Sequence, residues 1–270
     1  MRYKFKHKPY EHQLDALTKS WNTSEFAYFM DMGTGKSKVL IDNMCILYDR
    51  GEITGALVVA PKGVYRNWER GELPNHLPKH VIADIVLWNP NQTKKQLEEQ
   101  RKLFFPDDNL KIFIMNVEAL STKKGATIAE KFLIAHDALM AIDESTTIKN
   151  KDAKRTKTVV SLGKHAKYRR ILTGSPVTKS PLDLYSQCEF LDPWLLGHSS
   201  FFSFQHEYAV VQRRTMGAHS FNQVVGYRNL QKLNSLLEKF SFRVKKEDCL
   251  DLPDKVYVKR SVELTKEQRS

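Results

Sequence analysis

The sequence predicts an α/β fold, with a mostly parallel sheet covered by helices on both faces, and two patterns carry this prediction. Short apolar runs recur, at 26–30, 56–60, 82–88, 111–115, 138–142 and 169–173. They are mostly continuous rather than alternating, which is typical of strands buried on both faces of a parallel sheet. Segments with helical spacing lie between them, at 11–21, 36–48, 94–103, 128–134 and 153–162. This alternation indicates a doubly wound layer, in which ligands bind at the carboxyl ends of the strands.

The pattern changes after about Leu191. The stretch "EYAVVQRRTMGAHSFNQVVGY" predicts two strands joined by a turn around Met216 and Gly217, and "LQKLNSLLEKF" predicts a helix. Together they indicate a small protrusion on the α/β layer. The basic hairpin around Arg213 and Arg214 is open to three interpretations: a wedge for DNA, an arm for protein docking, or a surface hairpin without function.

Near its end, "LPDKVYVKRSVEL" enters an alternating strand just before Ser270, which indicates that a second domain follows. We therefore expect a nucleotide-binding lobe at 1–195, the protrusion at 196–245, and a linker with a first strand at 246–270.

Composition restricts the class of protein. The 270 residues are 41% hydrophobic and 27% charged, as in globular proteins, and no run of about 18 apolar residues indicates a membrane span. The basic N-terminus has no apolar core of a signal peptide. Three cysteines without a CxxC pair favour a reducing compartment over a disulfide framework or a zinc site. We expect a cytoplasmic location, in a bacterium or an infected host cell, or a nuclear one if the source is eukaryotic.

The net charge of +12 favours polyanionic partners. Between Lys149 and Arg170 there are nine Lys or Arg residues against one acid, Asp152. This run is either a solvated helix face or a nucleic-acid-binding track.

The stretch "MDMGTGKSK" predicts a phosphate-binding loop. Gly33 and Gly35 allow backbone N–H groups to converge on phosphate oxygens, Lys36 can reach the terminal phosphates, and the Ser37 hydroxyl can hold Mg²⁺. The helix that follows adds the partial positive charge of its N-terminus. Met30 departs from the strict G-x-x-x-x-G-K-[ST] pattern, which has Gly there.

Two further stretches can complete a nucleotide site. In "ALMAIDEST" an apolar strand ends in Asp143 and Glu144, whose side chains diverge, so that one can face Mg²⁺ and the other an attacking water. In "ILTGSPV" a strand runs into Thr173 and Ser175, whose hydroxyls can sense a neighbouring carboxylate or cap the helix that begins near Pro181.

The order of these motifs resembles the first motor lobe of a superfamily-two helicase, most closely the Swi/Snf-type, chromatin-remodeller-like branch. "KPYEHQLDAL" resembles the adenine-recognition segment of that branch, and "MDMGTGKSK" resembles its variant phosphate loop, in which the first Gly is not required. "VVAPKGVYRNWERGE" matches the next motif at Pro61, Asn67 and Trp68. "IFIMNVEAL", "IDEST", "TIKNKDAKRTK", "LTGSPV", "LDLYSQCEFLDP" and "FSFRVKKEDCLDLPDK" resemble the later segments of the lobe, in the family's order.

The resemblance implies a RecA-like P-loop NTPase fold that binds ATP and Mg²⁺. It implies catalytic roles for Lys36, Asp143 and Glu144. The implied ATP-binding residues are Tyr10, Gln13, Gly33, Thr34, Gly35, Lys36 and Ser37, with Ser37 and Asp143 on Mg²⁺. The implied coupling residues are Thr146, Thr173 and Ser175, and the nucleic-acid face would include Lys62, Asn116, Lys149, Lys151, Lys154 and Arg155.

The resemblance further implies a DNA-stimulated ATPase that moves along double-stranded DNA, a monomer of viral or bacterial origin without a membrane partner. An RNA helicase of the same superfamily and a non-catalytic nucleic-acid-binding module are the alternatives. Ser145 and Thr146 replace the Ala and His of the family's acidic motif, and in the family that His communicates with the hydroxyl motif, which corresponds here to the turn around Thr173 and Ser175. Because the arginines that the family places on its second lobe are absent, we expect this chain alone to hydrolyse ATP poorly.

Overall fold

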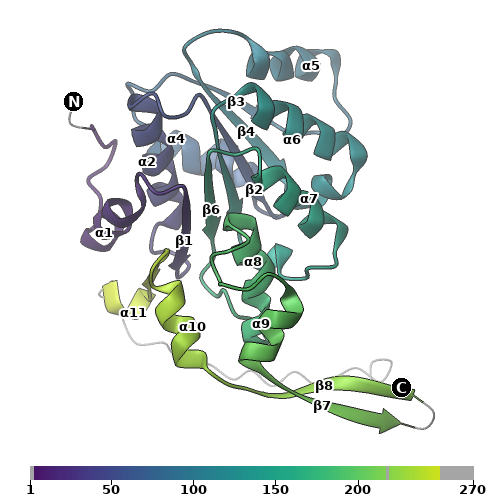
Figure 1. The fold of residues 1–270 in the computed structure, drawn as a ribbon. Coiled ribbons are helices and arrows are strands. Elements are labelled where there is room, and N and C mark those ends of the chain that lie inside the picture. The colour runs from purple at the N-terminus through teal and green to yellow at the C-terminus, as the bar shows by residue number, and fades with distance from the viewer. Residues whose placement is uncertain (1–2, 217–218, 250–270) are drawn as a thin grey trace, which may run out of the picture.

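The computed structural model describes residues 3–216 and 219–249, which form an α/β layer and an extended hairpin (Figure 1). Seven described strands form one sheet in the order β3-β4-β2-β5-β6-β1-β9, and all their pairings are parallel. The strands are β1 (Glu25–Met30), β2 (Gly55–Ala60), β3 (Ala83–Leu87), β4 (Leu110–Asn116), β5 (Ala138–Asp143), β6 (Tyr168–Leu172) and β9 (Ser241–Val244). This confirms the predicted fold class.

Helices cover both faces of the sheet (Figure 1). They are α1 (Glu11–Ser20), α2 (Lys36–Asp49), α3 (Tyr65–Asn67), α4 (Leu73–His76), α5 (Lys94–Arg101), α6 (Lys123–Ala135), α7 (Lys154–Gly163), α8 (Leu184–Leu191), α9 (Phe201–Tyr208), α10 (Leu230–Leu237) and α11 (Lys246–Cys249). Short helical turns of other types lie at Trp68–Glu72, Lys102–Phe104, Val117–Ser121, Ser145–Ile148 and Pro181–Asp183. None of the helices in the described ranges is long and apolar enough to cross a bilayer.

Alternate residues of each central strand enter two separate cores. In β1, Ala27 and Phe29 belong to the core that includes residues of α6, α7 and α8, while Phe26, Tyr28 and Met30 belong to the core that includes residues of α1 and α2. Because successive side chains of a strand point to opposite faces, both must be apolar where both faces are covered. This is why the strands are continuous apolar runs.

The hairpin is formed by β7 (Ala209–Met216) and β8 (His219–Tyr227), which pair antiparallel and extend away from the layer (Figure 1). The two predicted strands are confirmed. Apart from Ala209, at its base, the described residues of β7 are exposed. The hairpin therefore contributes little to either core.

β9 was not predicted, because four residues give too short a pattern. It lies inside the segment expected to be the protrusion, yet it is an edge strand of the main sheet, paired with β1 from Ala27↔Ser241 to Met30↔Val244. The strand predicted within 256–264 lies outside the described residues. The division at 195 and 245 stays a prediction.

Candidate nucleotide-binding and nucleic-acid-binding site

The three predicted motifs meet because their strands are neighbours. The phosphate loop (Asp31–Lys36) follows β1, Asp143 ends β5, and Thr173 follows β6, and the sheet order is β5-β6-β1. Since the strands are parallel, their carboxyl ends share one edge of the sheet. The sheet topology therefore brings together segments that are more than a hundred residues apart in the chain.

The phosphate loop has the backbone conformation that its glycines allow. Gly33 and Gly35 have φ angles of 86° and 87°, in the left-handed region that favours glycine. A side chain at Gly35 would also collide with Gln13, because a Cβ there would lie 2.2 Å from Nε2 of Gln13. Thr34 closes the turn, with its hydroxyl donating to the Asp31 carbonyl at 2.8 Å. α2 begins directly after the loop, at Lys36.

Helix α1 holds this loop from outside. Gln13 is 4% exposed, and its Nε2 donates to the Thr34 carbonyl at 3.0 Å while its Oε1 accepts from the Tyr10 backbone N–H at 3.1 Å. The Nε2 atom of His12 lies 2.8 Å from the same Thr34 carbonyl. Tyr10 is 63% exposed and stacks on His12. The amide of Gln13 therefore ties α1 to the loop.

Lys36 and Glu144 form the centre of the site. The Lys36 ammonium lies 3.3 Å from Oε1 of Glu144, and the Thr173 hydroxyl donates to Oε2 of Glu144 at 3.3 Å. Lys36 is buried, whereas the side chain of Glu144 is 34% exposed. Glu144 has a φ angle of 48°, a conformation that costs a non-glycine residue about 1–3 kcal/mol and that is concentrated at functional sites.

Asp143 lies deeper than Glu144. It is 8% exposed, and its Oδ2 accepts a hydrogen bond from the Trp68 indole N–H at 2.9 Å. Its Oδ1 accepts from the backbone N–H of Glu144 at 3.0 Å. Burial raises the pKa of Asp143, and the Trp68 bond and the nearby Lys36 charge oppose that rise. Trp68 was matched to a family motif, but its bond to a residue 75 positions away could not be predicted.

The residues expected to couple the motifs lie in different surroundings. The Thr173 hydroxyl contacts Glu144 and accepts from the Ser175 backbone N–H at 3.2 Å. The Thr146 hydroxyl forms no hydrogen bond within residues 3–216 and 219–249. Instead the Ser145 hydroxyl, which is buried, donates to Oε1 of Gln187 at 2.6 Å. In the described part of the chain, contact between the acidic pair and the turn that holds Thr173 and Ser175 runs through Glu144.

Two predicted nucleic-acid residues lie at the ends of adjacent strands, at the same edge of the sheet. Asn116 ends β4 opposite Ala60 of β2, and Lys62 follows β2 two residues later. Lys62 is exposed, and the buried Oδ1 of Asn116 has no hydrogen-bond partner among the described residues.

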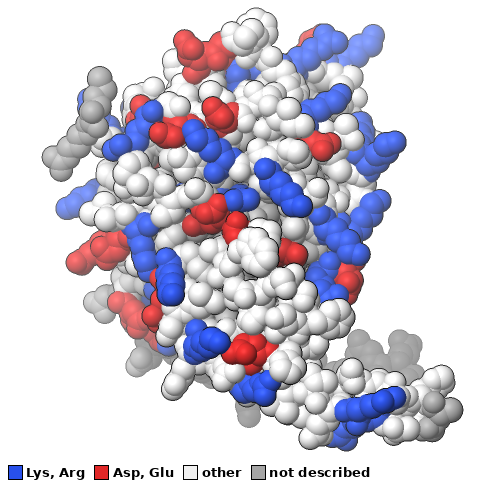
Figure 2. Space-filling view, in the orientation of Figure 1, with Lys and Arg blue, Asp and Glu red and all other residues white. Residues whose placement is uncertain are grey.

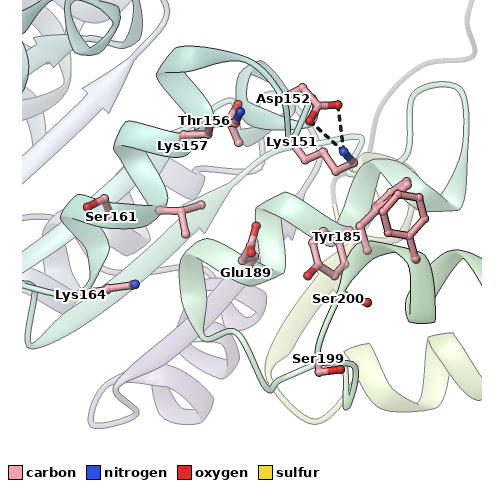
Figure 3. Close-up of a pocket in the computed structure, with 13 residues that line it drawn as sticks. Lys151, Asp152, Thr156, Lys157, Ser161, Lys164, Tyr185, Glu189, Ser199 and Ser200 are labelled. Atoms are coloured by element: carbon pink, nitrogen blue, oxygen red, sulfur yellow. Dashed lines mark hydrogen bonds and ion pairs between the residues drawn. The ribbon is translucent and has the colours of Figure 1, made fainter.

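The basic run divides into a surface part and an internal part. Figure 2 shows Lys and Arg side chains along the edge of the molecule where α5, α6 and α7 lie. Lys151, Lys157 and Lys164 line a pocket of about 480 Å³, together with Tyr185, Glu189, Phe201 and Phe202 (Figure 3). Lys151 pairs with Asp152 at 2.8 Å and lies 5.1 Å from the centre of the Phe201 ring. Lys154 is exposed, Arg155 is half-buried, and Lys149 donates to the Thr178 hydroxyl.

The last three bases of the run are engaged by neighbouring groups of the fold. Arg170 is fully buried and Arg169 pairs with Glu25, while Lys167 pairs with Glu52 at 3.0 Å. These three side chains hold β6 against neighbouring segments. Counting charges along the sequence therefore overstates the surface charge of this region.

The residues present fit Mg²⁺ and a nucleotide phosphate. Mg²⁺ prefers oxygen ligands and is usually held by one or two carboxylates together with substrate phosphates. Asp143 and Ser37 supply such oxygens at this edge of the sheet. Among the described residues no group of three or more His, Cys, Asp or Glu could hold a metal by itself. This donor set suits a metal that arrives with a phosphate.

Comparison with known proteins identifies the family. The family model described as "SNF2-related domain" matches residues 26–270. The chromatin-remodeling ATPase INO80 of Cryptococcus neoformans var. neoformans is 26% identical over 248 residues, which cover 88% of this chain and 13% of that protein. The protein of the same name from Saccharomyces cerevisiae is 26% identical over 243 residues, 88% of this chain and 15% of that protein. The chain thus spans a small part of the length of these curated relatives.

Solved structures agree on the fold. The Sulfolobus solfataricus SWI2/SNF2 ATPase core in complex with dsDNA has a TM-score of 0.68 and 24% identity, covering 91% of this chain and 46% of that one. The core domain from the same organism has a TM-score of 0.66 at 24% identity, covering 94% and 47%. The fold is that of a RecA-like lobe, and the chain belongs to the SNF2-related domain family.

Proposed function

We propose that this chain is the ATP-binding lobe of a DNA-dependent ATPase that couples ATP hydrolysis to movement along double-stranded DNA. The observation that carries the proposal is the contact of Lys36 with Glu144 at 3.3 Å, with Asp143 and Thr173 beside them. An ammonium at a phosphate loop, a buried metal-holding acid and a second acid for water are the groups that nucleotide hydrolysis requires. Family membership supports the same reading.

Each nucleotide-site residue then has a role. The backbone N–H groups of Gly33, Thr34 and Gly35 and the Lys36 ammonium bind the β and γ phosphates. Ser37 and Asp143 hold Mg²⁺, which supplies charge stabilisation at the phosphates when bound. Glu144 orients or deprotonates the attacking water. Thr173 and Ser175 report the state of Glu144 towards the nucleic-acid face.

Gln13 retains the capacity to read adenine. Its amide has two N–H donors and two acceptor lone pairs, of which the contacts to Thr34 and Tyr10 use one each. The remaining donor and acceptor match the N7 and N6 groups of adenine. Tyr10, at 63% exposed, is available to pack on the base.

The nucleic-acid face comprises Lys62, Asn116, Lys149, Lys151, Lys154 and Arg155. Contacts from Lys and Arg would go mainly to phosphates, so binding should be salt-dependent and largely independent of sequence. The relative solved in complex with dsDNA favours DNA as the partner. An RNA helicase is the second candidate, and comparing stimulation by DNA and RNA separates the two.

A second RecA-like lobe is part of this proposal. The chain covers 46% and 47% of the two solved cores, which is consistent with one lobe of two. An arginine that a second lobe places against the bound nucleotide can raise the rate of hydrolysis by a factor of about 10³–10⁵. The chain alone should therefore bind ATP and Mg²⁺ but hydrolyse ATP slowly.

Lys36→Ala should abolish measurable ATP binding while leaving the thermal midpoint without ligand nearly unchanged. The ammonium is the main cation at the loop, and its partner Glu144 is exposed enough to be solvated once unpaired. Calorimetric titration with ATP·Mg²⁺ and thermal unfolding without ligand test this. Lys62→Ala is the matched control: it should keep ATP affinity and weaken DNA binding. Unchanged ATP binding in Lys36→Ala would refute the proposed site, and a large drop in midpoint would make Lys36 structural.

Trp68→Phe should move the loss of Mg²⁺-dependent ATP binding to higher pH. Asp143 must be ionised to hold Mg²⁺, so binding is lost as pH falls through its pKa. Removing the Trp68 N–H bond, which stabilises the ionised form, raises that pKa further. A hydrogen bond to a charged group is worth about 1.5–3 kcal/mol, which corresponds to a shift of about one to two pH units.

The measurement is ATP affinity with and without Mg²⁺ over a series of pH values. Trp194→Phe is the control: Trp194 is 67% exposed, and its replacement should leave the pH dependence of Mg²⁺-dependent ATP binding unchanged. An unshifted profile in a folded Trp68→Phe protein would show that the indole does not control Asp143.

A further inference from the structure

The end of β9 is bonded to the phosphate loop. The Asp31 backbone N–H donates to the Val244 carbonyl at 3.1 Å, and the Lys246 backbone N–H donates to Oδ2 of Asp31 at 3.1 Å. The first bond extends the parallel pairing of β1 with β9 beyond Met30 and Val244, and the second ties the backbone after β9 to the Asp31 side chain. The residues that follow the two strands therefore lie side by side at the edge where the nucleotide site is.

The side chain of Lys246 lies over the loop. Its Cε and Nζ atoms are each 3.7 Å from the position that a Cβ on Gly33 would occupy. Gly33 is exposed and in the left-handed conformation, so the lysine covers a loop that has no side chain of its own there. Lys36 approaches the same loop from its buried side, whereas Lys246 approaches from solvent.

In the described contacts, the charged groups around Lys246 do not draw its ammonium away from the loop. The neighbouring Lys245 pairs with Glu247 at 3.1 Å, which matches one acid of α11. Asp31 is engaged through the Lys246 backbone N–H rather than through the ammonium in the described contacts. A long, exposed lysine beside glycine backbone provides charge where an anion can approach closely.

We propose that Lys246 is a second phosphate-contacting lysine, which reaches a bound nucleotide from the β9–α11 turn. The proposal rests on the proposed ATP site and adds to it a residue more than 200 positions away in the chain. Nucleotide binding would then fasten the β9–α11 turn to the phosphate loop through the ligand. Two simpler roles compete. In one, Lys246 is structural and only covers the loop. In the other, its ammonium occupies the position of a phosphate and competes with the nucleotide.

The test is titration of ATP·Mg²⁺ and ADP·Mg²⁺ into the wild-type chain, Lys246→Ala, Lys246→Arg and the adjacent control Lys245→Ala. We expect Lys246→Ala to weaken ATP binding about tenfold, as for one charge-assisted hydrogen bond at an exposed site, and ADP binding less. Lys246→Arg should retain most of the affinity, and Lys245→Ala all of it. Because an exposed charge is screened, the difference between wild type and Lys246→Ala should shrink at high salt.

The outcomes separate the hypotheses. If wild type binds ATP and Lys36→Ala does not, but Lys246→Ala binds normally, this inference is wrong and the proposed function stands. Tighter ATP binding by Lys246→Ala would show that the lysine competes with the nucleotide, and this result would also overturn the inference. If the folded wild-type chain binds no ATP, the proposed function itself fails. As a second readout, ATP should slow amide hydrogen exchange in Lys245–Cys249 in wild type and not in Lys246→Ala.

Discussion

Glu144→Gln should lower DNA-stimulated ATP turnover by about 10²–10⁴-fold while changing ATP affinity only a few-fold. The glutamine keeps the size of the side chain and can still accept from Thr173, which bonds Glu144 at 3.3 Å. It can no longer take a proton from water. It also loses the charge that faces Lys36 at 3.3 Å. Turnover should be measured with saturating DNA in the two-lobed protein that the proposed function implies.

Two results would bear on the role of Glu144. Glu118→Gln, an exposed glutamate that follows β4, should leave turnover unchanged and serves as the matched control. If Glu144→Gln retained full turnover, the base would have to be another group. Loss of ATP binding without an effect on the chemical step would instead assign Glu144 to holding Lys36.

Arg170→Ala should lower the free energy of unfolding by about 3–5 kcal/mol, in the range for breaking a buried charged network. All five N–H donors of the guanidinium are used, on Oδ1 of Asn43 and on the backbone carbonyls of Ser20, Thr23, Ser24 and Arg169, at 2.8–3.0 Å. Burial lowers the pKa of Arg170. Alanine would remove all five bonds, including the buried one to Oδ1 of Asn43, and open a cavity between β6 and α1.

Urea denaturation of the chain measures this loss. Lys164→Ala, an exposed base of the same run, should change stability by no more than about 0.5 kcal/mol. Arg170→Lys, which keeps the charge but not the five donors, should fall between the two and provides a folded variant if alanine does not fold. A loss below about 1 kcal/mol in Arg170→Ala would mean that the network is not a main support of the fold.

Local patterns predicted most of the elements, because strands buried on both faces and amphipathic helices leave unambiguous periodicities. The six runs predicted as sheet strands correspond to β1–β6, and the helices at 11–21, 36–48 and 153–162 correspond to α1, α2 and α7. β9 was missed because four residues carry too little periodicity, and its place in the sheet depends on pairing with a strand more than 200 residues earlier.

Residue types at the nucleotide site could also be predicted, since a phosphate loop and a strand-end acidic pair are short motifs. Their roles were not decided by type alone. Thr146 was predicted as a coupling residue, and in the described structure it is Glu144 that contacts Thr173. The 3₁₀ turn at Ser145–Ile148 directs Ser145 to Gln187 instead.

By itself the sequence determined the order of elements, the phosphate loop and the acidic pair, because each depends on neighbours within a few residues. The tertiary structure decided which lysines and arginines face solvent, which indole holds Asp143, and that Lys246 lies at the loop. Formal charge is the same for a buried and an exposed side chain, and hydrogen bonds across 75 to 215 residues depend on strand order. That order is fixed by packing of the whole sheet, which no local pattern contains.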